Sequence, residues 1–379
     1  MRFLRRATAL LAALTLLVAP SLATWSIVVV DTATGEVCVA GASCLNGVKK
    51  VIALVRVGEG AAASQATGDN GAVARMIIWA GMEAGKSPDE ILVDLQTALG
   101  GQVQARQFGI ASLLHAPVTF TGTIPGDAAG GVSGEVGTLR YAIQGNVMTG
   151  PEVWLAAELA LLTSPGDLSQ RAMAAMEAAR SMGGDGRCSC SQGNPTGCGA
   201  PPPYFRRTSL SAFLVVARIG DRNGICDNGS GCVSGEYYAN LAHGGNMQKP
   251  DPVFGLQRKY ADWRIQLGRV PDQVTSSVTP DSASLAPGAS VDVFLDLLDF
   301  EGGMVDTSVL TLSVERVSNA APVSFPAAIQ HLGQGIYQLT ITAGASAGSD
   351  TWRPWVETAS GRRIALQPDV VVQVSGSGG

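Results

Sequence analysis

One short segment, Gly268-Arg269-Val270-Pro271, divides the chain into two parts with different hydrophobic patterns. Before it, β-branched apolar runs alternate with pairs of segments whose apolar residues recur at helical spacing. After it, helical periodicity stops and short runs alternate between apolar and polar residues. A chain of 379 residues is long enough for about two domains. We therefore predict an α+β domain at 24–269, a linker at 270–276, an all-β domain at 277–375 and a flexible tail at 376–379.

Strand and helix patterns in the first domain predict stacked layers. Two β-branched runs around the turn Thr32-Ala33-Thr34-Gly35 predict a hairpin. Ser87, Pro88 and Glu90 predict a capping box with proline at the first helical position. The expected strands are 24–31, 36–43, 50–57, 60–65, 108–114, 118–122 and 209–219, and the expected helices are 71–84, 88–99, 151–162, 168–182 and 251–267. Strand groups that alternate with helix pairs predict two sheets covered by helices on the outside.

The second domain has about a hundred residues of strand pattern. Turns such as Ala286-Pro287-Gly288 and Gly333-Gln334-Gly335 separate the runs. The alternating runs lie at 291–295, 310–314, 337–341 and 370–374. This pattern predicts a β-sandwich of immunoglobulin type. The segment contains no cysteine, so the sandwich has no disulfide between its sheets.

The first 23 residues have the pattern of a secretory signal. A basic start at Arg2 to Arg6 precedes an apolar stretch, and the small residues Ser21 and Ala23 come just before Thr24. Cleavage after Ala23 would leave Thr24 as the first residue of a secreted or periplasmic protein. Elsewhere, no apolar run approaches the roughly 20 residues of a membrane span. The net charge of −5 and the absence of a basic cluster argue against nucleic acid as a partner.

We expect the seven cysteines to form disulfides where they can pair, because export leads to an oxidising compartment. Cys38 and Cys44 lie in one extended segment, about 20 Å apart, which is too far for a bond between them. We expect local pairs in the loops: Cys226 with Cys232, and Cys198 with Cys188 or Cys190. An odd total leaves at least one thiol unpaired. Zinc binding by the loop cysteines is the alternative, but an oxidising compartment favours disulfides over metal thiolates. The three histidines are also scattered, so we predict no metal and no cofactor.

A threonine at the N-terminus carries a nucleophile and a base on one residue. The hydroxyl of Thr24 would attack a carbonyl carbon, and its α-amine, with a reference pKa of about 7.7–8.0, would accept the proton near neutral pH. The alternative interpretation is that Thr24 merely happens to follow the signal segment.

Several motifs resemble a known family in order along the chain. They are Thr24 to Asp31, Ala63-Ser64-Gln65-Ala66, Arg106-Gln107, Phe120-Thr121-Gly122, Gln144-Gly145-Asn146, Gly183-Gly184-Asp185 and Asp251-Pro252-Val253. The chain from about Thr24 to Leu267 resembles the family catalogued as domain of unknown function 1028. That resemblance implies an N-terminal-nucleophile (Ntn) hydrolase fold, a four-layer αββα sandwich, and Thr24 as its nucleophile. The family's members generally lack an assigned substrate.

The resemblance also implies a basic residue on a strand near the nucleophile. Arg56 and Lys50 are the candidates, and Arg56 matches a basic position of the family. Arginine stays protonated, so Arg56 would supply positive charge but would not act as a base. The alternative for Lys50 is a solvated position at the start of a strand. Ser43 lies opposite Thr24 in the predicted hairpin and would relay a proton, unless it is simply a buried, hydrogen-bonded hydroxyl.

Polar residues in glycine-flanked segments are candidates for the remaining site. Asn146 would donate to an oxyanion, and Asp185 would orient an amine or bind a cation. Gln65 and Gln144 complete the predicted substrate-binding set. The alternative is that these side chains satisfy turn backbones. The loop at 187–207 interrupts the family pattern and is expected to cover or narrow the site.

Two functions follow from these observations. The first is an exported hydrolase that cuts the amide bond of a small molecule or peptide, using Thr24, Arg56 or Lys50, Ser43 and Asn146. The second is a non-catalytic extracellular protein for binding or surface adhesion, with a cell-surface partner reached through the C-terminal domain. The exposed threonine favours the first, and the attached sandwich favours the second.

Overall fold

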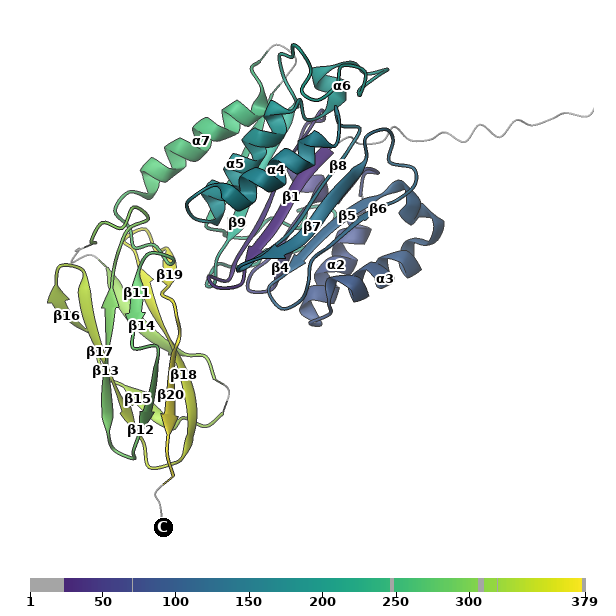
Figure 1. The fold of residues 1–379 in the computed structure, drawn as a ribbon. Helices are drawn as coiled ribbons and strands as arrows, with labels where there is room; N and C mark the ends of the chain where they lie inside the picture. Colours follow the sequence, from purple (N-terminus) through teal and green to yellow (C-terminus); the bar gives the residue numbers. More distant parts are fainter. Residues whose placement is uncertain (1–23, 70, 246–248, 306–309, 319, 377–379) are drawn as a thin grey trace, which may run out of the picture.

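Two β-sheets face each other in the N-terminal part of the chain, and helices cover the outer face of each (Figure 1). The computed structural model describes residues 24–69, 71–245, 249–305, 310–318 and 320–376. The predicted signal segment and the last three residues of the predicted tail lie outside these ranges.

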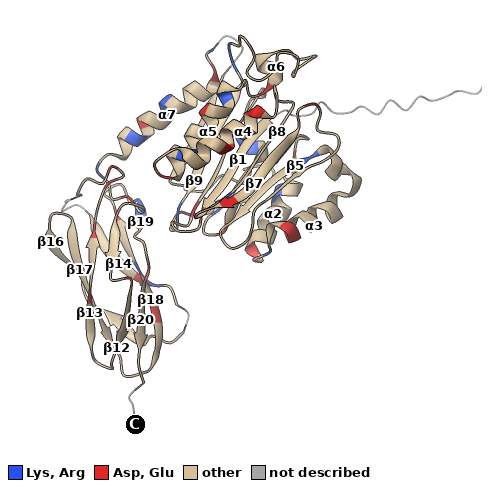
Figure 2. Ribbon diagram, in the orientation of Figure 1, with Lys and Arg blue, Asp and Glu red and all other residues tan. Residues whose placement is uncertain are grey.

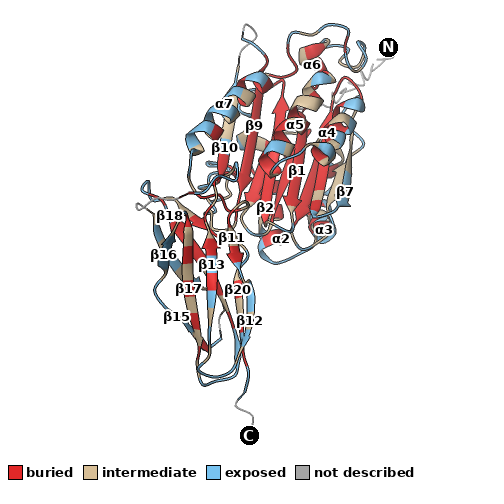
Figure 3. Ribbon diagram, turned by 60° about the vertical axis from the view of Figure 1, so that its left-hand side comes forward, coloured by how far each residue is buried: buried red, intermediate tan, exposed pale blue. Residues whose placement is uncertain are grey.

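The first sheet has six antiparallel strands in the order β10-β9-β2-β1-β8-β7. They are β1 (Thr24–Asp31), β2 (Glu36–Ser43), β7 (Gly130–Val136), β8 (Leu139–Asn146), β9 (Ser211–Ala217) and β10 (Ala239–Gly244). Side chains of β1 alternate between two cores: Trp25 and Ile27 face the helices, whereas Val28 and Val30 face the second sheet. Both faces of the central strands are therefore buried (Figure 3).

The second sheet has four antiparallel strands in the order β3-β4-β5-β6. They are β3 (Ala53–Arg56), β4 (Gly60–Gln65), β5 (Gln107–Ser112) and β6 (Val118–Thr121). Small residues on its inner face, including Ala61, Ala63 and Ala111, allow the two sheets to approach closely. Gly109 of β5 is required at its position, because a Cβ there would collide with the amide of Gln144 on β8.

Helices complete the layers. Those on the second sheet are α2 (Val73–Glu83) and α3 (Pro88–Leu99), and those on the first are α4 (Glu152–Thr163), α5 (Leu168–Ser181) and α7 (Pro252–Leu267). Three short helices are α1 (Val48–Ile52), η1 (Gly100–Ala105) and α6 (Gly186–Ser189). The predicted capping box at Ser87 and Glu90 is confirmed. A mixed α and β domain with helices outside the sheets is therefore the observed class.

Several predicted elements differ from the structure. The expected strand at 50–57 begins as helix α1, because Val48 and Ile52 are buried on one face while Lys50 is exposed. The sequence pattern does not predict β7, β8 or β10. Glycines make up three of the seven residues of β7, and because glycine is disfavoured in strands, the composition of this segment gives no strand signal.

In the described residues of the C-terminal part, the regular elements are all strands, and they form two sheets around one apolar core. One sheet contains β11 (Ser277–Thr279), β13 (Ser290–Asp296), β15 (Ser324–Pro326), β16 (Gln330–Gly333) and β17 (Ile336–Ala343). The other contains β12 (Ser282–Leu285), β14 (Thr311–Arg316), β18 (Gly348–Glu357), β19 (Arg363–Ala365) and β20 (Val370–Val374). The predicted β-rich class is confirmed, and the immunoglobulin type stays a prediction.

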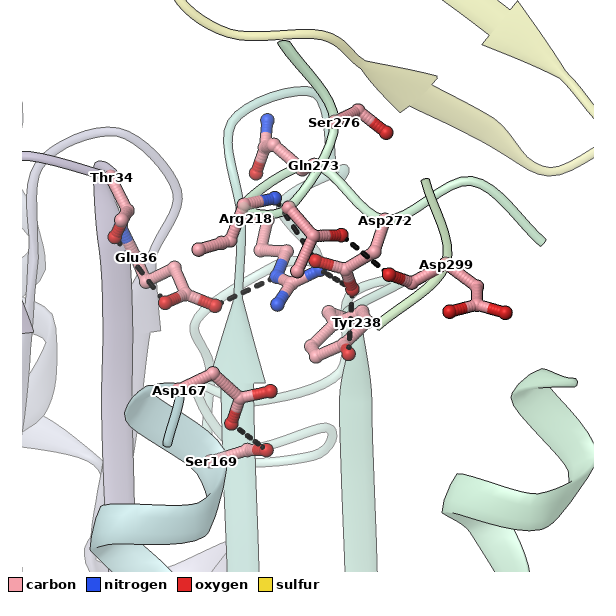
Figure 4. A network of polar contacts seen from close by, with 12 residues as sticks. Thr34, Glu36, Asp167, Ser169, Arg218, Tyr238, Asp272, Gln273, Ser276 and Asp299 are labelled. Atoms are coloured by element: carbon pink, nitrogen blue, oxygen red, sulfur yellow. Dashed lines mark hydrogen bonds and ion pairs between the residues drawn. The ribbon is translucent and has the colours of Figure 1, made fainter. Parts of the chain in front are cut away.

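The segment predicted as a linker is largely buried and makes several polar contacts with the N-terminal part. Asp272 accepts a hydrogen bond from Arg218 Nη1 at 2.6 Å and from the Tyr238 hydroxyl at 3.1 Å (Figure 4). Arg218 also pairs with Glu36 at the start of β2, Nε to Oε1 at 2.7 Å. Gln273 donates to the carbonyl of Ile219 at 3.0 Å. These contacts fasten the linker to the ends of β2 and β9.

Candidate functional site

Thr24 is the first residue of β1, and its neighbours in the sheet are two predicted site residues. Its partner on β2 is Ser43, and its partner on β8 is Asn146. All three residues are fully buried. Strand alternation directs the three side chains toward the second sheet, on the same face as Val28. The structure therefore brings Thr24, Ser43 and Asn146 together at one end of the inter-sheet layer.

Two glutamines of the second sheet meet this end of β1. Gln65, the last residue of β4, donates from Nε2 to the Thr24 carbonyl at 2.8 Å and to Gln107 Oε1 at 3.0 Å. Gln107 of β5 donates from Nε2 to the Gly145 carbonyl at 2.8 Å. The sequence analysis proposed Gln65 but missed Gln107. The alternation of side chains along β5 could have identified Gln107. It lies on the same face as Ala111, and this face packs against β1.

Gln144 lies on β8 two residues before Asn146, and its side chain points toward the second sheet like that of Asn146. Its Nε2 donates to Ser26 Oγ at 2.7 Å, and its Oε1 accepts from Thr119 at 3.4 Å. Gln144 is fully buried and bridges the two sheets behind Asn146. It belongs to the same polar layer as Thr24, but its amide is already occupied by protein partners.

Asp185 lies beside the end of β2, where its carboxylate forms an ion pair with the guanidinium of Arg187. Its carboxylate accepts from the backbone N–H of Cys44 at 2.7 Å and from Arg187 Nη2 at 2.8 Å and Nε at 3.1 Å. Burial raises the pKa of the Asp185 carboxyl, and the hydrogen bonds and charge of Arg187 oppose this rise. Because Cys44 follows Ser43 directly, the pair brings Arg187 to the Thr24 end of the sheet.

The loop at 187–207 is fastened to this end of the sheet by a disulfide. Cys188 is bonded to Cys44, a pair that the sequence analysis did not anticipate. Two expectations are confirmed: Cys226 is bonded to Cys232, and of the two alternatives for Cys198, Cys190 is its partner. Cys38 is a buried free thiol, and burial raises its pKa, so it is held neutral.

Backbone strain occurs at two residues that directly follow site residues. Ala66, after Gln65, has φ of 76°, and Val147, after Asn146, has φ of 56°. A non-glycine residue in this left-handed region is unfavourable, most of all a β-branched one. Such strain concentrates at functional sites, where neighbouring structure forces the conformation. Both outliers mark the end of the layer that holds Thr24.

The structure does not bring Arg56 to Thr24. In the sheet Arg56 pairs with Gly60, which is five residues from Gln65 along β4, or about 16 Å. Its guanidinium pairs instead with Glu59 at 2.5 Å and Glu83 at 3.1 Å. A strand of ordinary length therefore separates Arg56 from the end of the sheet that meets Thr24.

Lys50 is not part of the buried cluster either. Lys50 is exposed on α1, and the stem of its side chain lies beside Gly231. Its carbonyl accepts a hydrogen bond from Arg75 at 2.5 Å. The solvated position of the alternative interpretation agrees with this placement, but Lys50 lies on α1, three residues before β3 begins.

Few charges lie within the stacked sheets (Figure 2). Behind Gln107, the buried Asp69 pairs with Arg75 at 3.1 Å and Arg106 at 3.4 Å. Among the described residues, no group of three or more His, Cys, Asp or Glu side chains is arranged to hold a metal ion. The same part of the chain has no helix with the length and apolar character to cross a bilayer. The polar groups at the Thr24 end of the layer are hydroxyls, amides and the Asp185–Arg187 pair.

Comparisons with known proteins give limited similarity. No curated protein matches the chain. A solved structure from Silicibacter pomeroyi, described as a DUF1028 protein, is 20% identical with a TM-score of 0.47; the match covers 66% of this chain and 95% of that one. The Yersinia pseudotuberculosis adhesin InvE is 15% identical with a TM-score of 0.22; the match covers 28% of this chain and 27% of that one. Residues 24–193, which contain Thr24 and all the candidate residues around it, match the family model described as "Family of unknown function (DUF1028)".

Proposed function

We propose that the chain is an exported Ntn-type hydrolase that cuts an amide bond after Thr24 becomes its first residue. The observation that carries the proposal is the position of Thr24. It begins the central strand, Ser43 and Asn146 flank it, and Gln65 holds its carbonyl. The two strained residues at the same end give independent support.

The reaction that fits this arrangement begins at the threonine hydroxyl. Thr24 Oγ attacks the substrate's carbonyl carbon while the Thr24 α-amine takes the hydroxyl proton. The oxyanion accepts a hydrogen bond from Asn146 Nδ2, which here donates to the Pro125 carbonyl at a long 3.3 Å. The carbon–nitrogen bond then breaks, and the leaving amine takes the proton from the α-ammonium. Water attacks the remaining ester, releases the acid and restores the threonine.

Arg187 takes the role that the sequence analysis gave to Arg56 and Lys50. Its guanidinium is bonded to Asp185, and Asp185 binds the residue after Ser43. This pair would fix the end of β2, with the charge of Arg187 compensated by Asp185. The disulfide between Cys44 and Cys188 holds the loop that carries Arg187, and it fits an exported protein.

A second function, non-catalytic binding, is favoured by the burial of Thr24. Its exposed fraction is 0%, so a substrate has no access to the hydroxyl while this burial persists. In that case the C-terminal domain would bind a surface partner. Phe294 and Phe325, 42% and 54% exposed on one sheet, would be the contact residues.

The experiment is to export the full chain, determine its N-terminal residue by intact mass, and incubate it with a panel of N-acyl amino acids and dipeptide amides. The hydrolase predicts a start at Thr24 and release of free amine that a Thr24→Ala variant does not produce. A start elsewhere, or equal release by the two proteins, rejects the hydrolase and leaves the binding function.

A further inference from the structure

The carboxamide of Gln65 is only half satisfied. The residue is 1% exposed, and its Nε2 uses both hydrogens, on the Thr24 carbonyl and on Gln107 Oε1. Its Oε1 is buried and has no hydrogen-bond partner among the described residues. A buried acceptor without a donor is unfavourable, so such an atom needs an explanation.

The orientation of this amide is fixed by its neighbour. Gln107 Nε2 donates to the Gly145 carbonyl at 2.8 Å and to Thr121 Oγ1 at 3.0 Å, so Gln107 must present its oxygen to Gln65. Turning the Gln65 amide over would place its oxygen against two acceptors, the Thr24 carbonyl and Gln107 Oε1. These contacts fix which amide atom of Gln65 is the nitrogen, so the atom without a partner is the oxygen.

The unpaired oxygen lies near the backbone of Thr24. The oxygen and nitrogen of a carboxamide are about 2.3 Å apart, and Gln65 Nε2 is 2.8 Å from the Thr24 carbonyl oxygen, which places Oε1 within about 5 Å of that atom. The strained Ala66 holds Gln65 at the end of β4. The α-amine that cleavage would release belongs to the same residue as the carbonyl that Gln65 already binds.

We propose that Gln65 is a positioning residue whose Oε1 accepts a hydrogen bond from the α-amine of Thr24 once the preceding peptide bond is cut. This inference rests on the proposed function. Cleavage turns a peptide N–H with one hydrogen into an amine with at least two, and the additional hydrogen is the donor that Oε1 lacks. The bond would turn the amine's lone pair toward Thr24 Oγ.

A neutral acceptor suits this role better than a carboxylate. A carboxylate beside the amine would raise the pKa of the amine and keep it protonated at neutral pH, where it could not act as a base. The charged groups around the site are paired among themselves: Asp185 with Arg187, and Asp69 with Arg75 and Arg106. Gln65 therefore supplies orientation without a net charge.

The test measures the pKa of the Thr24 amine in residues 24–379, made by cutting a fusion directly before Thr24. The rate of acetylation of this amine by acetic anhydride is followed from about pH 5 to 10 by mass spectrometry. We expect Gln65→Glu to raise the midpoint by about one unit or more, and Gln65→Met to lower it. A cooperative thermal melt checks that each variant folds, and Gln65→Met, which is neutral and similar in size, decides the result if Gln65→Glu does not fold.

Folded variants whose midpoints stay within about 0.2 units of the parent protein would overturn the inference. Labelling of Thr24 by a hydroxyl-directed electrophile tests the proposed hydrolase separately from the role of Gln65. Labelling at Thr24 together with unmoved midpoints rejects only the role of Gln65. Shifted midpoints without any labelling of Thr24 support the role of Gln65 and reject the hydrolase.

Discussion

Arg218 and Asp272 form an ion pair across the junction of the N-terminal and C-terminal parts, with Nη1 and Oδ2 2.6 Å apart and each side chain 5% exposed. The Arg218 guanidinium also lies 3.4 Å from the centre of the Tyr238 ring. An arginine this deeply buried depends on its carboxylate partners, because an uncompensated charge in the interior is costly. The junction is therefore part of the folded structure and not a loose tether.

Removal of Asp272 is expected to destabilise the protein. Breaking a buried pair costs about 3–5 kcal/mol, and because Glu36 still pairs with Arg218, we expect about 3 kcal/mol for Asp272→Ala. Urea denaturation at pH 7 measures the difference. The control is Glu315→Ala, which breaks an exposed pair with Arg363 and should cost about 0.5 kcal/mol. Similar values for the two variants would contradict the importance of the junction.

The disulfide between Cys44 and Cys188 should contribute more stability than the one between Cys190 and Cys198. The first closes a sequence separation of 144 residues and the second one of 8. From chain entropy we expect losses of about 5 and about 2.5 kcal/mol for the paired serine variants. Denaturant titration of both double variants tests the order, and a larger loss for the short loop would count against it.

Asp167 should stabilise the fold in a pH-dependent way. Burial alone would raise its pKa, but the hydrogen bond from Ser169 and the charge of Arg264 outweigh burial and hold the pKa below its usual 3.8. A lowered pKa in the folded state means that the stabilisation is complete above about pH 4 and is lost as the pH falls through the folded-state value.

The corresponding variant is Asp167→Asn. We expect it to lose about 2 kcal/mol at pH 7, because the amide carries no charge to pair with Arg264, and to approach the parent protein at a pH below the folded-state pKa of Asp167. Urea titrations at both pH values measure this. Asp94→Asn, at an exposed pair with Lys86, is the control and should change little at either pH. A difference that stays constant with pH would show that the charge of Asp167 is not responsible.

Local signals in the sequence predicted the elements that depend on them. The hairpin that begins at Thr24 and the helix capped by Ser87 and Glu90 follow from strand pattern and capping chemistry within a few residues. Glycine-rich β7 was missed, because its stability comes from pairing with β8 and not from its own composition. Strands of this kind are specified by tertiary context.

The candidate site was predicted only in part for a similar reason. Ser43 follows from the hairpin register, and Asn146 and Gln65 follow from motifs. Arg56 lies at the other end of its sheet, and nothing local in the sequence reveals which end of a strand meets Thr24. The bond between Cys44 and Cys188 joins residues far apart in the sequence, and spacing alone does not identify such a pair.

The central claim is that Thr24 is a nucleophile, and covalent labelling tests it most directly. The exported protein is incubated with a β-lactone that acylates hydroxyl nucleophiles, and the adduct is located by intact mass and peptide mapping. We predict one adduct on Thr24, partial labelling of Thr24→Ser, which keeps hydroxyl and amine, and none of a folded Thr24→Ala. Equal labelling of the parent protein and Thr24→Ala would contradict the claim.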